Sequence, residues 1–470
     1  MISLTVNGKP RSLDGDTPLP EFLRSLEVDL RRVAVAVNGE VVPKRQYRGV
    51  VLRDGDEVEI VRRVGGGASS ELEARGSKLD PPLKPRPKAR PKARPKARLQ
   101  PGEAATVVIV GGGIIGCAIA YELSRLGVSC LVLDSRRVGM AATNAAAGVL
   151  APMAEFRRPG ALVRLGLESL RLWPEWVARL GDEVPDIDVE FRLNGVLRVA
   201  FEEEHLAELR AGLRYGGELG VEVIELDAAQ LQEAEPRLNP QLIGGVLCPE
   251  EGQVSNQLFT LALSRAAGKR GARVVEGAPV LGFRTKAGCV TAVRTPRGEF
   301  ACDHVVLAAG PWTRPIARKL GVDVPTHPVR GQMLALGRMV TPIHQPIWGP
   351  RGYVLPRANG LVFAGATVEE VGFRIRTTKR GLAQVRRGAF ELVPQLRHAR
   401  EHFSWAGLRP GSPDGLPMLG ALPGWENVTV ATGHFRNGIL LAPVTGELIA
   451  GAIVDGASDA LAPFDPARFA

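Results

Sequence analysis

Three glycines in the pattern Gly111-x-Gly113-x-x-Gly116 are spaced to hold a phosphate group. They follow the apolar run 107–110, typical of a buried strand, and precede a stretch with helical spacing. Such a turn lets the backbone approach a pyrophosphate and directs the positive end of a helix at it. Asp134 ends the next apolar run, where a carboxylate accepts hydrogen bonds from ribose hydroxyls. The pattern therefore predicts a dinucleotide-binding site.

This fingerprint fits NAD and FAD equally. The run "VVLAAGPW" at 305–312 predicts a second strand ending in Ala-Gly, an arrangement seen in flavoproteins that have two dinucleotide-binding domains. No second G-x-G-x-x-G appears where a separate NAD domain would begin. These observations favour FAD as the single dinucleotide.

The elements that must position this site begin at Thr106. Apolar runs such as "VSCLVLD", "DHVVLAAG" and "NVTVATG" predict buried strands, and segments with helical spacing lie between them. Their order predicts that residues 106–470 form a Rossmann-type dinucleotide-binding domain interleaved with a smaller substrate domain built on an antiparallel sheet. The predicted fold class is thus α/β and α+β.

Residues 1–67 predict a separate β-rich domain. Alternating apolar residues at 2–6 begin a hairpin, and further strands are expected at 33–37 and 57–64. Apolar residues at helical spacing over 19–26 predict one helix between the strand pairs. The order ββαββ is that of a β-grasp, or ubiquitin-like, fold.

A proline-rich, basic segment follows the glycine tail Gly65–Gly67. Within 68–105 the unit P-K-A-R repeats, and proline at that density excludes helix and sheet. Between residues 84 and 98 lie eight basic residues with no acid among them: Lys84, Arg86, Lys88, Arg90, Lys92, Arg94, Lys96 and Arg98. Setting them aside leaves 52 basic and 50 acidic residues, a net charge of +2, so most of the net charge of +10 comes from these eight residues. We predict a disordered linker that acts as an extended spacer or, alternatively, as a tether for an anionic partner.

Composition argues against several classes of function. The low aromatic content disfavours a stacking surface for single-stranded nucleic acid, so no nucleic-acid partner is expected. Five cysteines without a C-x-x-C pair fit free thiols in a reducing cytoplasm. The sequence begins without a signal-peptide pattern, and glycines interrupt its one long uncharged run, 104–121. We therefore expect a cytoplasmic protein with no membrane span.

No metal site is expected either. His398 and His402 have a spacing compatible with zinc, but the acid of H-E-x-x-H and a third nearby ligand are missing. A solvated helix face explains the pair better.

Four stretches resemble the glycine oxidase family, in the D-amino-acid oxidase group of flavoproteins: "VVIVGGGIIGCAIAYEL", "TNAAAGVLAP", "WAGLRPGSPDGLPMLG" and "GHFRNGILLAPVTGELIA". The resemblance covers 107–451. It implies an enzyme that binds FAD noncovalently and oxidises glycine, or another small amino acid, to its imine. Oxygen would be the electron acceptor and hydrogen peroxide a product, and hydrolysis of the imine would give glyoxylate and ammonia.

By this resemblance, FAD contacts come from the glycine-rich turn, the strand ends around it and a C-terminal segment. These residues are Gly111, Gly113, Ile114, Ile115, Gly116, Asp134, Ser135, Thr143, Ala147, Gly148, Val149, Val254, His434, Phe435, Arg436, Asn437, Gly438, Ile439 and Leu440.

The resemblance assigns substrate binding to Tyr353, Arg409 and Arg436. The residue types agree with this role, because an α-amino acid must be held in one orientation and the planar fork of arginine matches a carboxylate. Arg351 departs from the family, in which a histidine stands two residues before the site tyrosine. Because arginine is longer than histidine and could change which amine fits the pocket, the resemblance does not fix the exact amine substrate.

Residues 1–67 resemble the sulfur carrier protein of thiamine biosynthesis, a ubiquitin-like protein that ends in Gly-Gly. In that family an adenylyltransferase activates the terminal carboxylate, which becomes a thiocarboxylate, and thiazole synthase joins its sulfur to the imine of glycine. The two resemblances therefore imply one pathway. Gly67 would carry the reactive carboxylate, but a peptide bond joins it to Ala68, so a carrier function requires cleavage after Gly67.

Two other interpretations stay open. In the first, the enzyme is an oxidase or dehydrogenase of D-amino acids or N-methyl amines, and its N-terminal domain is not a sulfur carrier. Alternatively, the chain would be a docking protein that recruits partners through its ubiquitin-like domain and basic linker. In any of these cases we expect a homo-oligomer.

Overall fold

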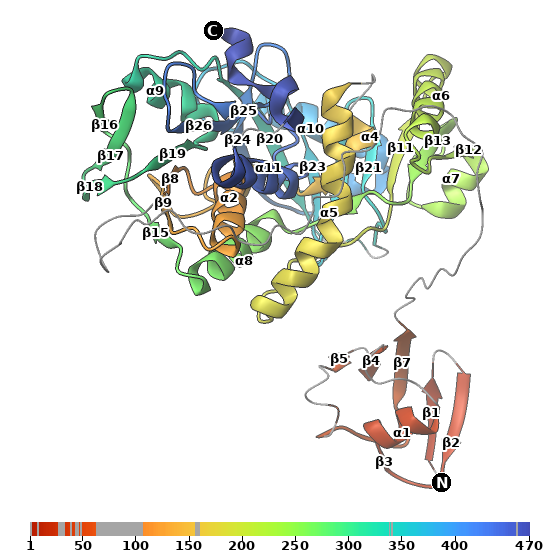
Figure 1. Cartoon of the computed structure of the whole chain (residues 1–470). Coiled ribbons are helices and arrows are strands. Elements are labelled where there is room, and N and C mark those ends of the chain that lie inside the picture. Colours follow the sequence, from red (N-terminus) through yellow and green to blue (C-terminus); the bar gives the residue numbers. More distant parts are fainter. Residues whose placement is uncertain are drawn as a thin grey trace, which may run out of the picture. The chain divides into compact units, whose positions relative to one another are not determined.

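The computed structural model describes residues 2–62, with gaps at 7–8, 27–32, 38–39, 43–46 and 48, and residues 107–470, with gaps at 156–159, 338, 340–341 and 457–458. Contacts between residues divide the chain into two compact units, 1–85 and 86–470, which are described separately (Figure 1). The predicted linker and Gly67 lie outside the described residues.

The first unit is a five-stranded sheet with one helix packed against it. Its elements are β1 (Ile2–Val6), β2 (Lys9–Leu13), β3 (Thr17–Pro18), α1 (Leu19–Ser25), β4 (Val33–Val37), β5 (Glu40–Val42), β6 (Val51–Leu52) and β7 (Glu57–Arg62). The sheet order is β2-β1-β7-β4-β5, and β1 and β7 pair in parallel. Leu19, Phe22 and Leu23 of α1 are buried in one core with Leu4 and Val58. The predicted β-grasp fold is confirmed.

The second unit is built on two sheets. The six-stranded one has the order β15-β9-β8-β19-β26-β25. Its strands are β8 (Val107–Val110), β9 (Cys130–Leu133), β15 (Arg273–Val275), β19 (His304–Leu307), β25 (Met418–Ala421) and β26 (Val428–Thr432). All neighbours pair in parallel except β25 and β26. This is the predicted Rossmann-type sheet.

Both faces of this sheet are covered, which explains why its strands are continuous apolar runs. Val107 and Ile109 pack toward the helices, whereas Val108 and Val110 pack toward the opposite layer. The helical layer is α2 (Ile114–Arg125), α5 (Ala161–Glu183), α8 (Asn256–Lys269) and α11 (Ala442–Asp455), which lie side by side in Figure 1. The opposite layer is α9 (Thr313–Ala317) with the sheet of β16 (Gly282–Lys286), β17 (Cys289–Thr295) and β18 (Gly298–Ala301).

The second large sheet has eight strands in the order β12-β13-β11-β21-β22-β23-β20-β24. They are β11 (Val196–Ala200), β12 (Ile224–Asp227), β13 (Gly244–Cys248), β20 (His327–Leu336), β21 (Ile347–Gly349), β22 (Gly352–Pro356), β23 (Val362–Gly365) and β24 (Glu401–Gly411). Only β11 and β21 pair in parallel, so the sheet is mixed but mainly antiparallel.

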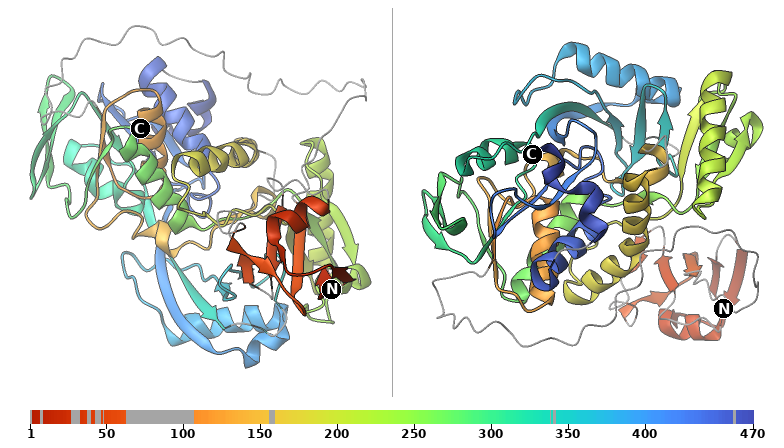
Figure 2. Two further views of the ribbon diagram at one scale, coloured as in Figure 1. Left: turned by 90° about the horizontal axis from the view of Figure 1, so that it is seen from below. Right: turned by 45° about the horizontal axis from the view of Figure 1, so that its top comes forward.

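Three helices flank this substrate sheet. α10 (Lys379–Leu392) packs against β20, β22 and β23, while α6 (Glu203–Glu218) and α7 (Ala228–Ala234) pack at the β12–β13 end (Figure 2). Short elements connect the two sheets: α3 (Ala142–Ala145), α4 (Pro152–Glu155) and the pair β10 (Val149–Leu150) and β14 (Gly252–Gln253). Segments of the two sheets alternate along the chain, as predicted.

Strand alternation decides which side chains of the substrate sheet face inward. Leu334 of β20 and Val354 of β22 pack in one cluster with Val385 of α10. Their neighbours Met333 and Tyr353 therefore point to the other face.

None of the helices in the described part of the chain has the length and apolar content that crossing a bilayer requires.

Candidate active site

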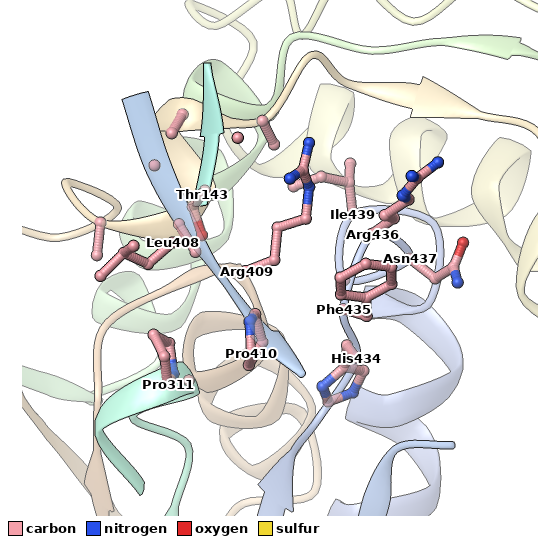
Figure 3. A pocket seen from close by; sticks show the side chains of 18 of the residues that line it. Thr143, Pro311, Leu408, Arg409, Pro410, His434, Phe435, Arg436, Asn437 and Ile439 are labelled. Carbon is pink, nitrogen blue, oxygen red and sulfur yellow. The ribbon is translucent and has the colours of Figure 1, made fainter. Parts of the chain in front are cut away.

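A cavity of about 980 Å³ lies between the carboxyl ends of the Rossmann strands and the substrate sheet. Its walls include the ends of β8, β9, β19 and β26, together with residues of β20, β22 and β24. Open α/β sheets place ligands at the carboxyl ends of their strands, so the cavity is where a dinucleotide is expected. Figure 3 shows part of its lining.

Most predicted site residues line this cavity. The predicted FAD contacts in the lining are Gly111, Gly113, Ile114, Ile115, Asp134, Ser135, Thr143, Ala147, Gly148, Val149, His434, Phe435, Arg436, Asn437, Gly438, Ile439 and Leu440. The predicted substrate residues Tyr353, Arg409 and Arg436 line it as well. Gly116 and Val254 do not, and Gly67 lies outside the described residues.

Gly116 acts on the cavity through packing. A Cβ atom at Gly116 would overlap the carbonyl oxygen of Gly111, so only glycine lets α2 start so close to β8. Gly111 has φ +112°, and a Cβ there would overlap the carbonyl of Ala308. This bare backbone forms a cradle of the kind that a pyrophosphate requires, and it fits FAD.

Val254 acts in a similar indirect way. It is fully buried, and its amide donates to the carbonyl of Gly148 at 2.8 Å. A Cβ at Gly148 would in turn overlap the Val254 carbonyl oxygen. Val254 therefore holds the Gly148 turn, which itself lines the cavity.

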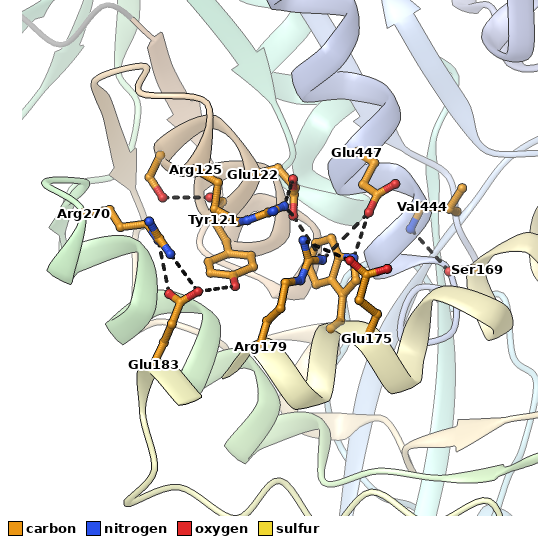
Figure 4. A network of polar contacts seen from close by, with 12 residues as sticks. Tyr121, Glu122, Arg125, Ser169, Glu175, Arg179, Glu183, Arg270, Val444 and Glu447 are labelled. Atoms are coloured by element: carbon orange, nitrogen blue, oxygen red, sulfur yellow. Dashed lines mark hydrogen bonds and ion pairs between the residues drawn. The ribbon is translucent and has the colours of Figure 1, made fainter. Parts of the chain in front are cut away.

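The helix that starts at the glycine turn is fixed by a polar network at its other end (Figure 4). Glu122 of α2 is buried and pairs with Arg125 at 2.8 Å and with Arg179 of α5 at 3.5 Å. Burial raises the pKa of Glu122, and the two guanidinium groups counteract this rise. Tyr121 donates to Glu183 of α5 at 2.8 Å. These contacts tie α2 to α5, so the N-terminus of α2 has a defined position.

Asp134 occupies the place predicted for a ribose acceptor. Its two carboxylate oxygens accept from the amides of Gly112 and Arg136, each at 2.7 Å. Burial raises the pKa of Asp134, although both amides stabilise its charged form. The carboxylate is thus held at the end of β9, beside the glycine cradle.

Sequence reasoning missed one part of this end of the cavity. Ala278, Pro279 and Val280 line it after β15. The amide of Ala278 donates to the carbonyl of Asp134 at 2.7 Å, which places the segment next to the predicted ribose position. No residue type marks it in the sequence, because only the pairing of β15 with β9 brings it there.

At the substrate end, Arg409 projects from β24 and is held by a buried network. Its Nη1 donates to the carbonyl of Thr367 at 3.0 Å. The Thr367 hydroxyl accepts from the backbone amide of Gln332 at 3.0 Å and donates to Glu369 at 3.2 Å. Glu369 in turn pairs with the buried Arg330 at 2.7 Å. Burial raises the pKa of Glu369, but hydrogen bonds from Arg330 and Gln332 outweigh it and lower the pKa below its usual value.

Tyr353 and Arg436 enter the cavity from two other segments. The Tyr353 ring lies against Trp348, with centroids 4.7 Å apart, and its hydroxyl contacts the sulfur of Met333 at 3.4 Å. The guanidinium carbons of Arg409 and Arg436 lie 6.0 and 5.4 Å from the centroid of the Phe435 ring. Figure 3 shows both arginines extending in the same general direction, with Phe435 between their bases.

The turn that carries Arg436 has an unusual backbone. Phe435 has φ +49°, a left-handed conformation that is rare for a bulky residue and is often found at functional sites. Its amide donates to the carbonyl of Pro410, next to Arg409, at 2.9 Å. His434 precedes it, and burial lowers the pKa of His434 to about 3, so this ring is neutral at physiological pH.

The described lining is strongly cationic. Seven arginines line the cavity: Arg136, Arg198, Arg351, Arg380, Arg387, Arg409 and Arg436. Asp134 is the one carboxylate among the described lining residues. This balance suits the pyrophosphate of a dinucleotide together with a carboxylate ligand.

The comparisons with known proteins agree with this geometry. The family "FAD dependent oxidoreductase" (DAO) matches residues 106–452, most of the chain. The chain belongs to the FAD-dependent oxidoreductase family. The ThiS family matches residues 4–67, so a ThiS domain precedes the oxidoreductase.

Among the curated relatives of this oxidoreductase is a glycine oxidase from Geobacillus kaustophilus, 34% identical over 367 residues that cover 77% of this chain and 96% of the relative. A "Bifunctional protein ThiO/ThiG" from Synechocystis sp. is 38% identical over 374 residues, which cover 77% of this chain and 54% of the relative. The chain therefore spans about half the length of that bifunctional relative.

Solved structures give the same result for the fold of the oxidoreductase. A crystal structure of glycine oxidase from Geobacillus kaustophilus has a TM-score of 0.74 at 32% identity and covers 78% of this chain and 99% of its own. L-Proline dehydrogenase from P. horikoshii has a TM-score of 0.73 at 23% identity and shows the shared fold. The predicted fold class and family are confirmed.

Gly116→Ala should weaken FAD binding in this oxidoreductase. The added Cβ would displace the Gly111 carbonyl, and overpacking of this kind costs about 1–3 kcal/mol, or roughly 5- to 150-fold in Kd. Titration of the apoprotein with FAD, followed by flavin fluorescence, measures the effect. Gly268→Ala in α8 is the matched control, because nothing lies near its added Cβ. Equal FAD affinities for the two variants would contradict the assigned packing role.

Arg409→Leu should remove a charge-assisted contact to the substrate carboxylate. Truncation of one partner of such a pair costs about 2–5 kcal/mol, which corresponds to a loss of roughly 30- to 4000-fold in kcat/KM for amino-acid oxidation. FAD content should not change. Arg409→Lys keeps the charge but not the planar fork, so its loss should be smaller. Arg397→Leu, at an exposed position outside the cavity, serves as the control. Wild-type kcat/KM in Arg409→Leu would show that the carboxylate binds elsewhere.

Proposed function

We propose that the chain oxidises glycine to its imine in this cavity, with noncovalently bound FAD as cofactor and oxygen as electron acceptor. The main support is that one cavity holds the glycine cradle and, at its other end, Arg409, which the Thr367 carbonyl orients. Similarity to the glycine oxidase from Geobacillus kaustophilus also supports glycine as the substrate.

Three groups would hold a small amino acid. Arg409 would donate to the substrate carboxylate, because its guanidinium lines the cavity and its contact with the Thr367 carbonyl helps to orient the planar fork. Arg436 and the Tyr353 hydroxyl would contact the same end of the substrate. Trp348, which packs on the Tyr353 ring, would limit the room beside Cα and favour a small side chain.

The charge of the lining also favours the reactive form of the amine. Like charges disfavour protonation, so Arg409 and Arg436 should lower the pKa of the bound ammonium and favour release of its proton to solvent. When bound, FAD would supply the two-electron oxidation of the Cα–N bond and pass the electrons to oxygen, giving hydrogen peroxide. Gly111, Gly113, Asp134 and the segment 434–440 would hold it. Water would then hydrolyse the released imine to glyoxylate and ammonia.

The N-terminal ThiS region would serve the same pathway. In this proposal residues 1–67 are the sulfur carrier, 68–105 a linker and 106–470 the oxidase. The carrier would meet an adenylyltransferase and thiazole synthase, and the latter would also consume the imine of glycine for the thiazole of thiamine. The relative named "Bifunctional protein ThiO/ThiG" supports a fused arrangement of this kind. All five cysteines are free thiols, which supports a location in the reducing cytoplasm.

A substrate screen with peroxide detection tests the oxidase. We expect the purified protein to show a flavin spectrum and to form peroxide from glycine with a higher kcat/KM than from D-alanine. Acid precipitation should release the flavin into the supernatant, since no cysteine is among the described lining residues. Preference for a D-amino acid would support the alternative D-amino-acid oxidase. Flavin retained by the precipitate would contradict noncovalent binding.

Mass spectrometry of the endogenous protein tests the carrier. Adenylation needs a free α-carboxylate, which an amide carbonyl cannot replace. We therefore expect a fragment that ends at Gly67, and a form of it heavier by the exchange of one oxygen for sulfur. A variant with Gly67→Pro should block processing and thiamine formation but leave peroxide formation intact. If only the intact chain is found in cells that make thiamine from it, the carrier role fails and a docking role becomes the better account.

A further inference from the structure

One part of the cavity lining lies outside the residues proposed to contact glycine or FAD. Arg351, Arg380, Gln384 and Arg387, here called the rim cluster, are exposed residues that line the cavity. The last three lie on α10 at positions i, i+4 and i+7, so they share one helix face.

Packing ties this helix face to the substrate end. A Cβ at Gly388, next to Arg387, would lie 2.8 Å from the carbonyl oxygen of Arg351, in the turn that leads to Tyr353. Gly381, next to Arg380, packs directly against the side chain of Gln332, whose backbone amide holds Thr367 behind Arg409. The rim cluster therefore lies beside Arg409, the residue predicted to bind the substrate carboxylate.

The rim cluster has surplus positive charge. Arg351 is balanced by Glu391, with a contact of 2.7 Å. Neither Arg380 nor Arg387 forms an ion pair or hydrogen bond with any of the described residues. The one carboxylate among the described lining residues, Asp134, lies at the opposite end of the cavity. Two positive charges at the cavity opening thus have no counterpart in this part of the protein.

These two positive charges give no net electrostatic attraction for glycine. At neutral pH it is a zwitterion with no net charge, so a cationic opening neither attracts nor repels it appreciably. An amino acid with a second anionic group has a net charge of −1, and a field of one sign concentrates such a substrate at the opening.

We propose that the rim cluster makes the enzyme prefer amino acids with a second anionic group, such as N-carboxymethylglycine (iminodiacetate), over zwitterionic amines of similar size. The inference rests on the amine oxidation proposed above and extends it to a substrate class. The second carboxylate lies toward Arg380 and Arg387, while the first carboxylate binds Arg409.

The test compares iminodiacetate with N-methylglycine, which lacks only the second carboxylate. In the wild type, kcat/KM for iminodiacetate should fall as ionic strength rises, because the Debye length shrinks from about 10 Å at 0.1 M to about 3 Å at 1 M. The double variant Arg380→Gln/Arg387→Gln should lose roughly 2- to 30-fold in kcat/KM for iminodiacetate, since each exposed charge pair contributes modestly. Turnover of N-methylglycine and glycine should not change.

Lys379→Gln/Arg397→Gln is the matched control. It removes the same charge at exposed positions outside the cavity and should affect neither substrate. An equal loss for both substrates in the rim variant, or an equal loss in the control, would overturn the proposal.

A binding measurement separates this proposal from the oxidase proposal. Calorimetric titration should show that malonate binds more tightly than acetate to the wild-type protein, and that this difference shrinks in the rim variant but not in the control. If no amine yields peroxide, the proposed function fails, while the titration still decides the rim cluster. Equal malonate affinities in the wild type and the rim variant would overturn the proposed role of the rim cluster.

Discussion

The close approach of α2 to β8 is the constraint on which the rest of the oxidoreductase unit depends. It exists because Gly116 has no side chain to meet the Gly111 carbonyl. The same contact fixes where the helix begins and therefore where its free amides and partial positive charge are directed. Pairing of Glu122 with Arg179 then holds the helix against α5. The position of the phosphate site is thus set by the packing of α2, which an ion pair at the far end of the helix supports.

The substrate end is organised by a different principle. Strand alternation alone places Tyr353 on the inner face of its sheet, but it does not orient a side chain as long as Arg409. That orientation comes from the chain of contacts through Thr367 and Glu369 to Arg330. The lowered pKa of Glu369 keeps this carboxylate charged at physiological pH, so its ion pair with Arg330 persists there. The long Arg409 side chain is thus oriented by groups that lie behind it, Thr367 first among them.

The parts of the site that could be predicted from the sequence are those with a local physical cause. The turn at Gly111 is marked by glycines because bare backbone is required there, and the strands beside it are uniformly apolar because both faces are buried. Val280 carried no such mark, since it reaches the cavity only through the pairing of β15 with β9. Val254, predicted to contact FAD, lies behind Gly148 and outside the lining, and its contact with FAD stays a prediction. The arginines of α10 were missed for a different reason, because an exposed basic helix face usually only keeps a protein soluble.

The distribution of charge joins the two ends of the cavity into one chemical environment. A dinucleotide pyrophosphate and a substrate carboxylate are both anions, and the lining meets them with arginines and neutral backbone amides. His434 adds no charge, because burial lowers its pKa to about 3. His434 therefore contributes nothing to the positive field between pH 5 and 8. The same field opposes an ammonium group, so under the proposed function the neutral form of the amine would fit this cavity better. Binding of the carboxylate and loss of the amine proton would then both be driven by Arg409 and Arg436.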